Sequence, residues 1–92
     1  MKQARPYIKP EKRLKGKKIP PDIKNEAVAI AKELDAGVHF AELNGRRMYQ
    51  TGVVSFVLKR WYRLVAVPTE TGYCAVEIMS HEAYNKSGYV KA

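Results

Sequence analysis

The stretch that decides the fold is residues 56–81, FVLKRWYRLVAVPTETGYCAVEIMSH, in the last third of the chain. It holds two runs rich in β-branched and aromatic residues on either side of the turn-forming segment 68–72. Such a pattern predicts a β-hairpin. A further apolar run precedes it across the tight connection Lys59-Arg60, which lacks the Asn-Gly chemistry that two-residue loops prefer. We therefore predict an antiparallel meander with strands at 53–58, 61–67 and 73–79.

A helix is predicted before these strands. Pro20-Pro21-Asp22 is a helix start, because proline is tolerated in a first turn and an aspartate there favours the helix dipole. Gly37 provides a stop, since glycine accepts the left-handed conformation past a helix end. Between them, apolar residues recur on one helical face, at Ile23, Ala27, Ile30, Ala31 and Leu34. The pattern predicts a core-packing helix at 21–35, and a short second helix at 38–43 ended by Asn44-Gly45.

These elements define an α+β fold class: a small antiparallel sheet, a meander of three to four strands, packed against an N-terminal helix or helical hairpin. A chain of 92 residues has room for one small core. We divide it into a basic extended arm at 1–19 and a single α+β domain at 20–92. Within the arm, Tyr7-Ile8 is the pair that would anchor it to the core.

Positive charge is concentrated in the arm. The chain carries a net charge of +8, and residues 1–24, with nine basic and two acidic side chains, account for +7 of it. Such an arm suits sequence-blind contact with nucleic acid or ribosome. An acidic protein partner and plain solvation are the alternatives. The arm residues that we assign to nucleic-acid binding are Lys12, Arg13, Lys15, Lys17 and Lys18.

Several classes of protein are not indicated. Cys74 is the only cysteine, so the chain forms no internal disulfide, which fits a cytoplasmic protein. No apolar run has the length of a membrane span, and the N-terminus does not resemble a secretory signal. There is no glycine-rich phosphate loop and no Cys/His cluster with metal spacing. We expect no metal and no cofactor.

Period-two alternation sorts the last two strands into faces. If Val67 pairs with Tyr73, an apolar face toward the helix contains Tyr62, Leu64, Ala66, Cys74, Val76 and Ile78. Arg63 then lies opposite Glu77 on the other face. This pair is either an exposed ion pair or a phosphate-binding guanidinium oriented by a carboxylate. Trp61 and Tyr73 on that face either stack with bases, cover the sheet or receive a partner.

The two histidines differ in their surroundings. His39 lies among apolar residues, and a lone histidine there is more often packed or exposed than a ligand. His81 follows the last strand, near Tyr84 and Lys86, where a loop would aim it. Since its imidazole titrates near neutral pH, His81 is a candidate general acid or base.

The order of these segments resembles the RelE/ParE superfamily of toxins from type II toxin–antitoxin systems. The resemblance covers about residues 21–86 and is carried by Leu43-Asn44-Gly45, by Tyr62-Arg63-Leu64-Val65 and by the run 78–84, IMSHEAY. It implies a bacterial or phage toxin that is bound by an acidic antitoxin. Members of the superfamily normally begin with a strand, so this sheet is expected to lack that strand or to recruit it near Tyr7-Ile8.

The resemblance implies a ribosome-dependent mRNA endonuclease that needs no metal. In that branch a base deprotonates a ribose 2′-hydroxyl, which attacks the adjacent phosphate. Arg63 would then clamp the phosphate, His81 would be the acid or base, and Tyr84 would orient the RNA or assist proton transfer. Further nucleic-acid contacts are expected from Lys59, Arg60, Trp61 and Lys86. The alternatives are a ParE-like inhibitor of DNA gyrase without nuclease chemistry, and a small nucleic-acid-binding accessory protein.

Overall fold

A computed structural model describes residue 14 and residues 19–48, 51–70 and 72–88. The described elements confirm the predicted α+β class: a helix precedes a four-stranded antiparallel sheet. In chain order the elements are α2 (Pro21–Asp35), the 3₁₀ helix η1 (Phe40–Leu43), β1 (Arg46–Arg47), β2 (Val54–Leu58), β3 (Tyr62–Pro68), β4 (Tyr73–Ser80) and α3 (His81–Lys86).

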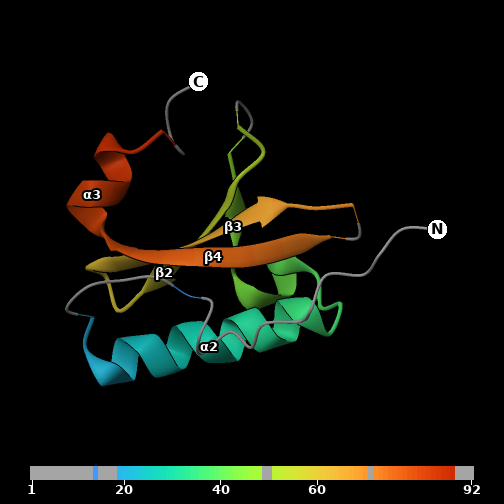
Figure 1. The fold of residues 1–92 in the computed structure, drawn as a ribbon, viewed down its shortest axis with the longest axis horizontal. Helices are drawn as coiled ribbons and strands as arrows, with labels where there is room; N and C mark the ends of the chain where they lie inside the picture. Colours follow the sequence, from blue (N-terminus) through green and yellow to red (C-terminus); the bar gives the residue numbers. More distant parts are fainter. Residues whose placement is uncertain (1–13, 15–18, 49–50, 71, 89–92) are drawn as a thin grey trace.

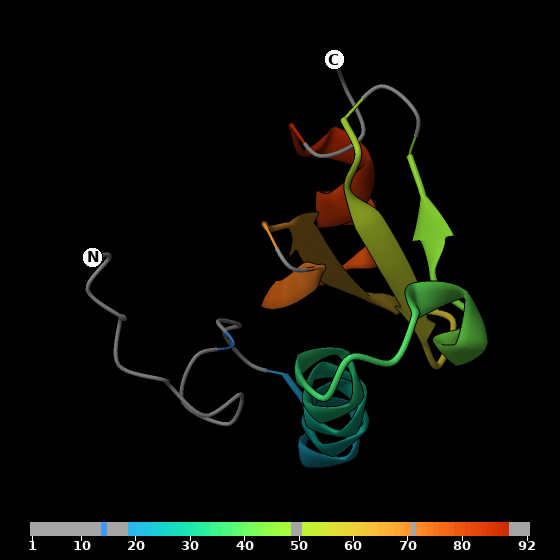
Figure 2. The same cartoon turned by 90° about the vertical axis from the view of Figure 1, so that its right-hand side faces the viewer.

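The sheet separates the two helices. Its strand order is β1-β2-β3-β4, so each strand pairs with its neighbour in sequence. Helix α2 lies along one face and α3 lies on the opposite side, at the end of β4 (Figures 1 and 2). β2 and β3 are internal strands, whereas β1 and β4 form the edges among the described elements.

The main core lies between α2 and the sheet. The predicted helix bounds are confirmed, with Pro21 and Asp22 in the first turn. Its buried residues pack against the inner face of the sheet, where Phe56, Leu58 and Leu64 are fully buried. Leu14 joins this core with 7% of its surface exposed, although no sequence pattern singled it out. The predicted anchor Tyr7-Ile8 lies outside the described residues.

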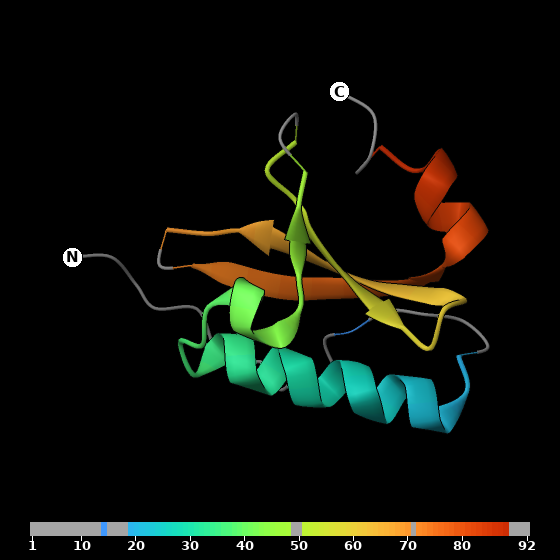
Figure 3. The ribbon, with the colours of Figure 1, turned by 180° about the vertical axis from the view of Figure 1, so that it is seen from behind.

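The second predicted helix is a single 3₁₀ turn. The imidazole of His39 accepts a hydrogen bond from the Ala41 amide through Nδ1 at 3.1 Å and so caps η1. Asn44 ends the turn in the left-handed conformation, with φ of 64°. Gly45 then passes close to Phe56, which brings the chain into β1 at the sheet edge (Figure 3). Tyr49 and Gln50, which follow, lie outside the described residues.

The predicted register of β3 and β4 is wrong along the whole ladder, by one residue near the turn and by two residues beyond Ala66. Val67 pairs with Cys74 rather than with Tyr73, and Arg63 pairs with Met79 rather than with Glu77. The shift at Val67 arises at the turn, where Pro68 instead of Val67 pairs with Tyr73. The further shift at Arg63 comes from an irregularity beside Val65 and Ala66, where Val76 is the extra residue on β4. A β-bulge of this kind reverses the faces of the residues beyond it. As a result Ala75, not Cys74 or Val76, is fully buried in the core against α2.

The connection of β2 and β3 is tight, as predicted, but it has three residues, because Trp61 lies in the turn and not in β3. The turn is also strained. Lys59 and Arg60 have φ values of 46° and 72°, the left-handed region that glycine and asparagine favour. The Lys59 ammonium forms an ion pair with Asp22 at 3.1 Å. This contact joins the tip of the hairpin to the first turn of α2.

The prediction that His81 lies in a loop is wrong. His81 is the first residue of α3. Ser80 caps this helix by accepting a hydrogen bond from the Ala83 amide at 3.2 Å. Tyr84 points back to the sheet and packs with Val53 and Val65 in a second, smaller core cluster. The outer face of the sheet is thus partly covered by α3.

Candidate nucleic-acid interface

Arg63 lines a cavity of about 560 Å³ on the outer face of the sheet, which we call the Arg63 cavity. Its described lining comes from the end of η1, from β1, β2 and β3, and from α3. The lining residues are Asn44, Arg46, Met48, Ser55, Val57, Arg63, Tyr84 and Asn85. Both charged groups in this set are guanidinium groups, so the cavity is suited to an anion.

The Arg63 guanidinium is held by the hairpin. Its Nη1 donates hydrogen bonds to the carbonyl oxygens of Tyr62 at 3.0 Å and Arg60 at 3.2 Å. Since these bonds use the backbone of the strained turn, the geometry of Lys59-Arg60 helps to fix the position of Arg63. The predicted orienting partner Glu77 lies opposite Val65 instead.

The three residues predicted to be catalytic are divided between two cavities. Tyr84 lines the Arg63 cavity, but its residue is 6% exposed and its hydroxyl is buried without a hydrogen-bond partner among the described residues. His81 lines a separate cavity of about 330 Å³ with Trp61, Tyr62, Ser80 and Glu82, which we call the Trp61 cavity. Its Nε2 lies 3.2 Å from the Asn85 amide nitrogen, and its Nδ1 is buried.

The other predicted contacts surround the hairpin tip and α3. Lys59, Arg60 and Lys86 are exposed, and Trp61 exposes 65% of its surface. The tip therefore combines a large exposed aromatic ring with positive charge. Five predicted arm residues lie outside the described residues: Lys12, Arg13, Lys15, Lys17 and Lys18.

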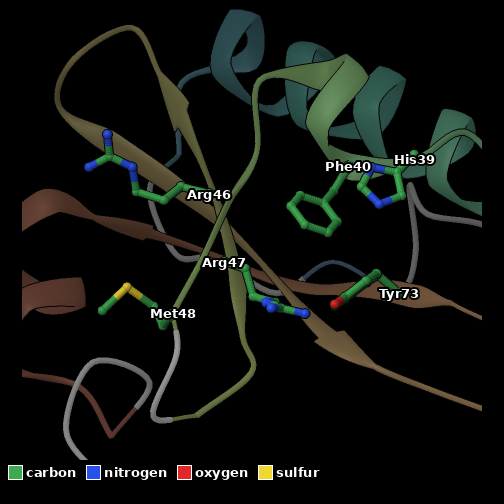
Figure 4. Close-up of a pocket in the computed structure, with 6 residues that line it drawn as sticks. All are labelled: His39, Phe40, Arg46, Arg47, Met48 and Tyr73. Atoms are coloured by element: carbon green, nitrogen blue, oxygen red, sulfur yellow. The ribbon is translucent and has the colours of Figure 1, made fainter.

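A larger cavity, of about 750 Å³, was not anticipated from the sequence. We call it the Phe40 cavity, and its described lining is His39, Phe40, Arg46, Arg47, Met48 and Tyr73. Figure 4 shows the Arg47 guanidinium directed toward Tyr73, with Phe40 and His39 beside it and Arg46 on the other side of β1.

Sequence reasoning missed Arg46 and Arg47, although the Arg-Arg pair after Asn44-Gly45 was an available signal. Both arginines lie on an exposed edge strand of only two residues, too short to show an alternating pattern. The assembly of the cavity also depends on β4 placing its first residue, Tyr73, against η1, which the tertiary fold alone decides.

Among the described residues, no group of three or more His, Cys, Asp or Glu side chains is placed to hold a metal ion. Within the same part of the chain, no helix has both the length and the apolar character needed to cross a bilayer.

The chain thus forms a small, basic α+β domain with two arginine-lined cavities. A family model described as the ParE-like toxin domain matches residues 21–86, and the chain belongs to this family. It is therefore a toxin of a toxin–antitoxin module, as the resemblance to the RelE/ParE superfamily implied. No curated protein and no solved structure matches the chain.

Proposed function

We propose that this toxin acts on DNA gyrase by binding, as a ParE-like inhibitor, and does not itself cut mRNA. The observation that carries the proposal is the absence of an acid–base pair in the described lining of the Arg63 cavity. The residues that β2 contributes there, Ser55 and Val57, are neutral, and arginine stays protonated at any physiological pH.

Cleavage through a 2′-hydroxyl needs a base within hydrogen-bond reach of that hydroxyl, about 2.6–3.2 Å away. His81, the residue expected to act as the acid or base, does not line the Arg63 cavity. It lines the separate Trp61 cavity. A phosphate held at Arg63 would thus meet guanidinium groups, amides and hydroxyls, and the hydroxyl of Tyr84 among them is buried. This favours a binding role over the nuclease role expected from the sequence.

The test uses purified full-length protein with gyrase and relaxed plasmid. We expect inhibited supercoiling or trapped cleaved DNA at micromolar protein, and no new transcript ends when the toxin is induced in a bacterium. Unchanged gyrase activity at that concentration would contradict the proposal. New in-frame cuts in ribosome-bound mRNA would also contradict it, because they would show nuclease activity.

The second candidate is the ribosome-dependent endonuclease, favoured by one observation: Tyr84 shares the Arg63 cavity with Arg46 and Arg63. In that case transcript cleavage should fall strongly in both Arg63→Ala and Tyr84→Phe. Tyr84→Phe should leave the fold intact, because it removes a buried hydroxyl that has no described partner. Toxicity that survives both substitutions, with no cut transcripts, would remove this candidate.

We further propose that the antitoxin is acidic, because the toxin carries a net charge of +8. A short acidic reading frame beside the gene is its expected source. Co-expression of that frame should restore growth and yield a complex that dissociates as salt is raised. A complex insensitive to salt would show that the attraction is not chiefly electrostatic.

A further inference from the structure

We propose that the Phe40 cavity binds one nucleotide of a single-stranded nucleic acid, and that the strand continues past Arg46 into the Arg63 cavity. This site is separate from the gyrase inhibition proposed above. Its test requires neither gyrase nor toxicity, so that the two proposals stand or fall independently.

The first argument is the aromatic wall. The rings of His39 and Phe40 are stacked with centroids 4.4 Å apart, and Phe40 meets Tyr73 edge to face at 5.1 Å. Phe40 and Tyr73 also pack on the main core, which fixes their positions. Rigid aromatic side chains are the platforms on which bases of single strands stack, with little dependence on sequence.

The second argument is the charge of the lining. Arg46 and Arg47 bring two guanidinium groups to the cavity, and its described lining includes no carboxylate. Guanidinium groups bind phosphate through two parallel hydrogen bonds. A volume of about 750 Å³ lies within the range of about 300–1,000 Å³ of sites for small organic ligands. Aromatic faces beside guanidinium groups match a base joined to a phosphate.

The third argument concerns the path of the ligand. Arg46 and Met48 line both the Phe40 cavity and the Arg63 cavity, so the two adjoin across β1. The arginines that line them, Arg47, Arg46 and Arg63, therefore follow one another across the sheet edge. Such a series suits successive phosphates of a strand better than a single free nucleotide.

The charge part is tested with full-length protein and a fluorescein-labelled oligonucleotide of eight uridines, by anisotropy over a range of salt concentrations. Arg47→Gln should weaken binding, and the slope of log K against log salt should become less steep by about 0.7, the value for one phosphate contact on a single strand. The matched control is Lys24→Gln, an equal loss of charge at an exposed position of α2. A slope that changes equally in both variants would overturn the assignment.

The aromatic part is tested with Phe40→Leu. We expect affinity to fall about five-fold or more, because stacking is lost, while the salt slope stays the same. A thermal melt establishes that the variant is folded. Because Phe40 also packs on the core, native protein is examined in parallel by photocrosslinking to an iodouridine oligonucleotide. Crosslinks at Phe40 or Tyr73 support the site, and crosslinks confined to residues 1–18 or to Trp61 overturn it.

A third experiment, with uridine monophosphate, distinguishes binding of a strand from binding of a free nucleotide. The proposal expects the octamer to bind at least ten-fold more tightly than the mononucleotide, and equal affinities would overturn the continuous path. An acidic peptide containing tyrosine serves as the last probe. If it bound at the cavity and the octamer did not, the proposal would be overturned in favour of a protein partner.

Discussion

Gly45 is required by its contact with the core. A Cβ at this position would lie 2.6 Å from Phe56 Cε2 and 2.9 Å from Val54 Cγ1, and both side chains are buried. We expect Gly45→Ala to destabilise the protein by about 1–3 kcal/mol, since the core must shift to admit a methyl group. Urea denaturation measures the change. Gly88→Ala is the control, because a Cβ there meets nothing within 4 Å. Equal effects in both variants would contradict this explanation.

Arg60 is strained, and its strain can be relieved. Its φ of 72° costs an ordinary residue about 1 kcal/mol or more, whereas glycine adopts it freely. Arg60→Gly should therefore raise the free energy of unfolding by roughly 1 kcal/mol, and it keeps the carbonyl that Arg63 uses. Lys24→Gly in α2 should lower it by a similar amount, because glycine disfavours a helix interior. A loss of stability in Arg60→Gly would refute the strain argument.

At the scale of residues, the sequence predicts which face of the sheet a side chain occupies better than it predicts the contacts that the side chain makes. Arg63 was correctly placed on the face away from α2, because the apolar alternation of β3 left no other choice. Its hydrogen bonds to the turn could not be foreseen, since they depend on side-chain torsions. The division of His81 and Tyr84 between two cavities was not foreseen either, because the sequence did not reveal that both residues belong to α3.

Between elements, the contact of the hairpin tip with α2 gives a pH dependence. The hydrogen bond from Lys59 lowers the pKa of Asp22 below its ordinary value. A lowered folded-state pKa stabilises the fold above the unfolded-state pKa, and this contribution disappears as pH falls through the folded-state pKa. Lys59→Gln should return the Asp22 pKa toward its ordinary value in an NMR titration. Lys86→Gln, at the end of α3, should leave it unchanged.

The stability of the two proteins completes this test. Any difference in urea midpoint between wild type and Lys59→Gln at neutral pH should vanish once Asp22 is protonated in both. Both side chains are more than half exposed, so the difference will be small. A difference that grows on acidification would contradict the assigned pairing.

Among the elements, α2, β2, β3 and β4 were predictable because each is long enough to show its period. The bounds of α2 agree with the prediction to the residue. β1 and α3, with two and six residues, were not predicted as a strand and a helix, because such short segments carry little periodicity. The bulge in β4 was also missed, since alternation alone assumes that no residue is inserted.

For the whole molecule, Leu14 determines where the chain can be shortened. It is buried in the main core, whereas residues 1–13 contribute five basic and one acidic side chain. Deleting residues 1–13 should preserve cooperative unfolding and flatten the salt dependence of nucleic-acid binding. Deleting residues 1–18 should in addition cost about 2 kcal/mol or more, as for other buried leucine losses. Denaturation and salt titration of both truncations measure the two effects, and equal stability would show that Leu14 is dispensable.

The α+β class and the main core followed from the sequence, because a chain of this length must use its amphipathic helix α2 to cover its sheet. The second core cluster, under α3, did not follow. The Phe40 cavity could not follow in the same way. It joins residues from positions 39 to 73, which only the tertiary fold brings together.

The extra residue in β4 has a consequence for the comparison of this toxin with its homologues. A relative that lacks the bulge is one position shorter between Tyr73 and Glu77, so a correct alignment must open a gap at Val76. Without that gap, Tyr73 would be matched with a residue from the opposite side of the sheet. An alignment shifted by one column would then give a false picture of which residues homologues have at the Tyr73 position of the Phe40 cavity.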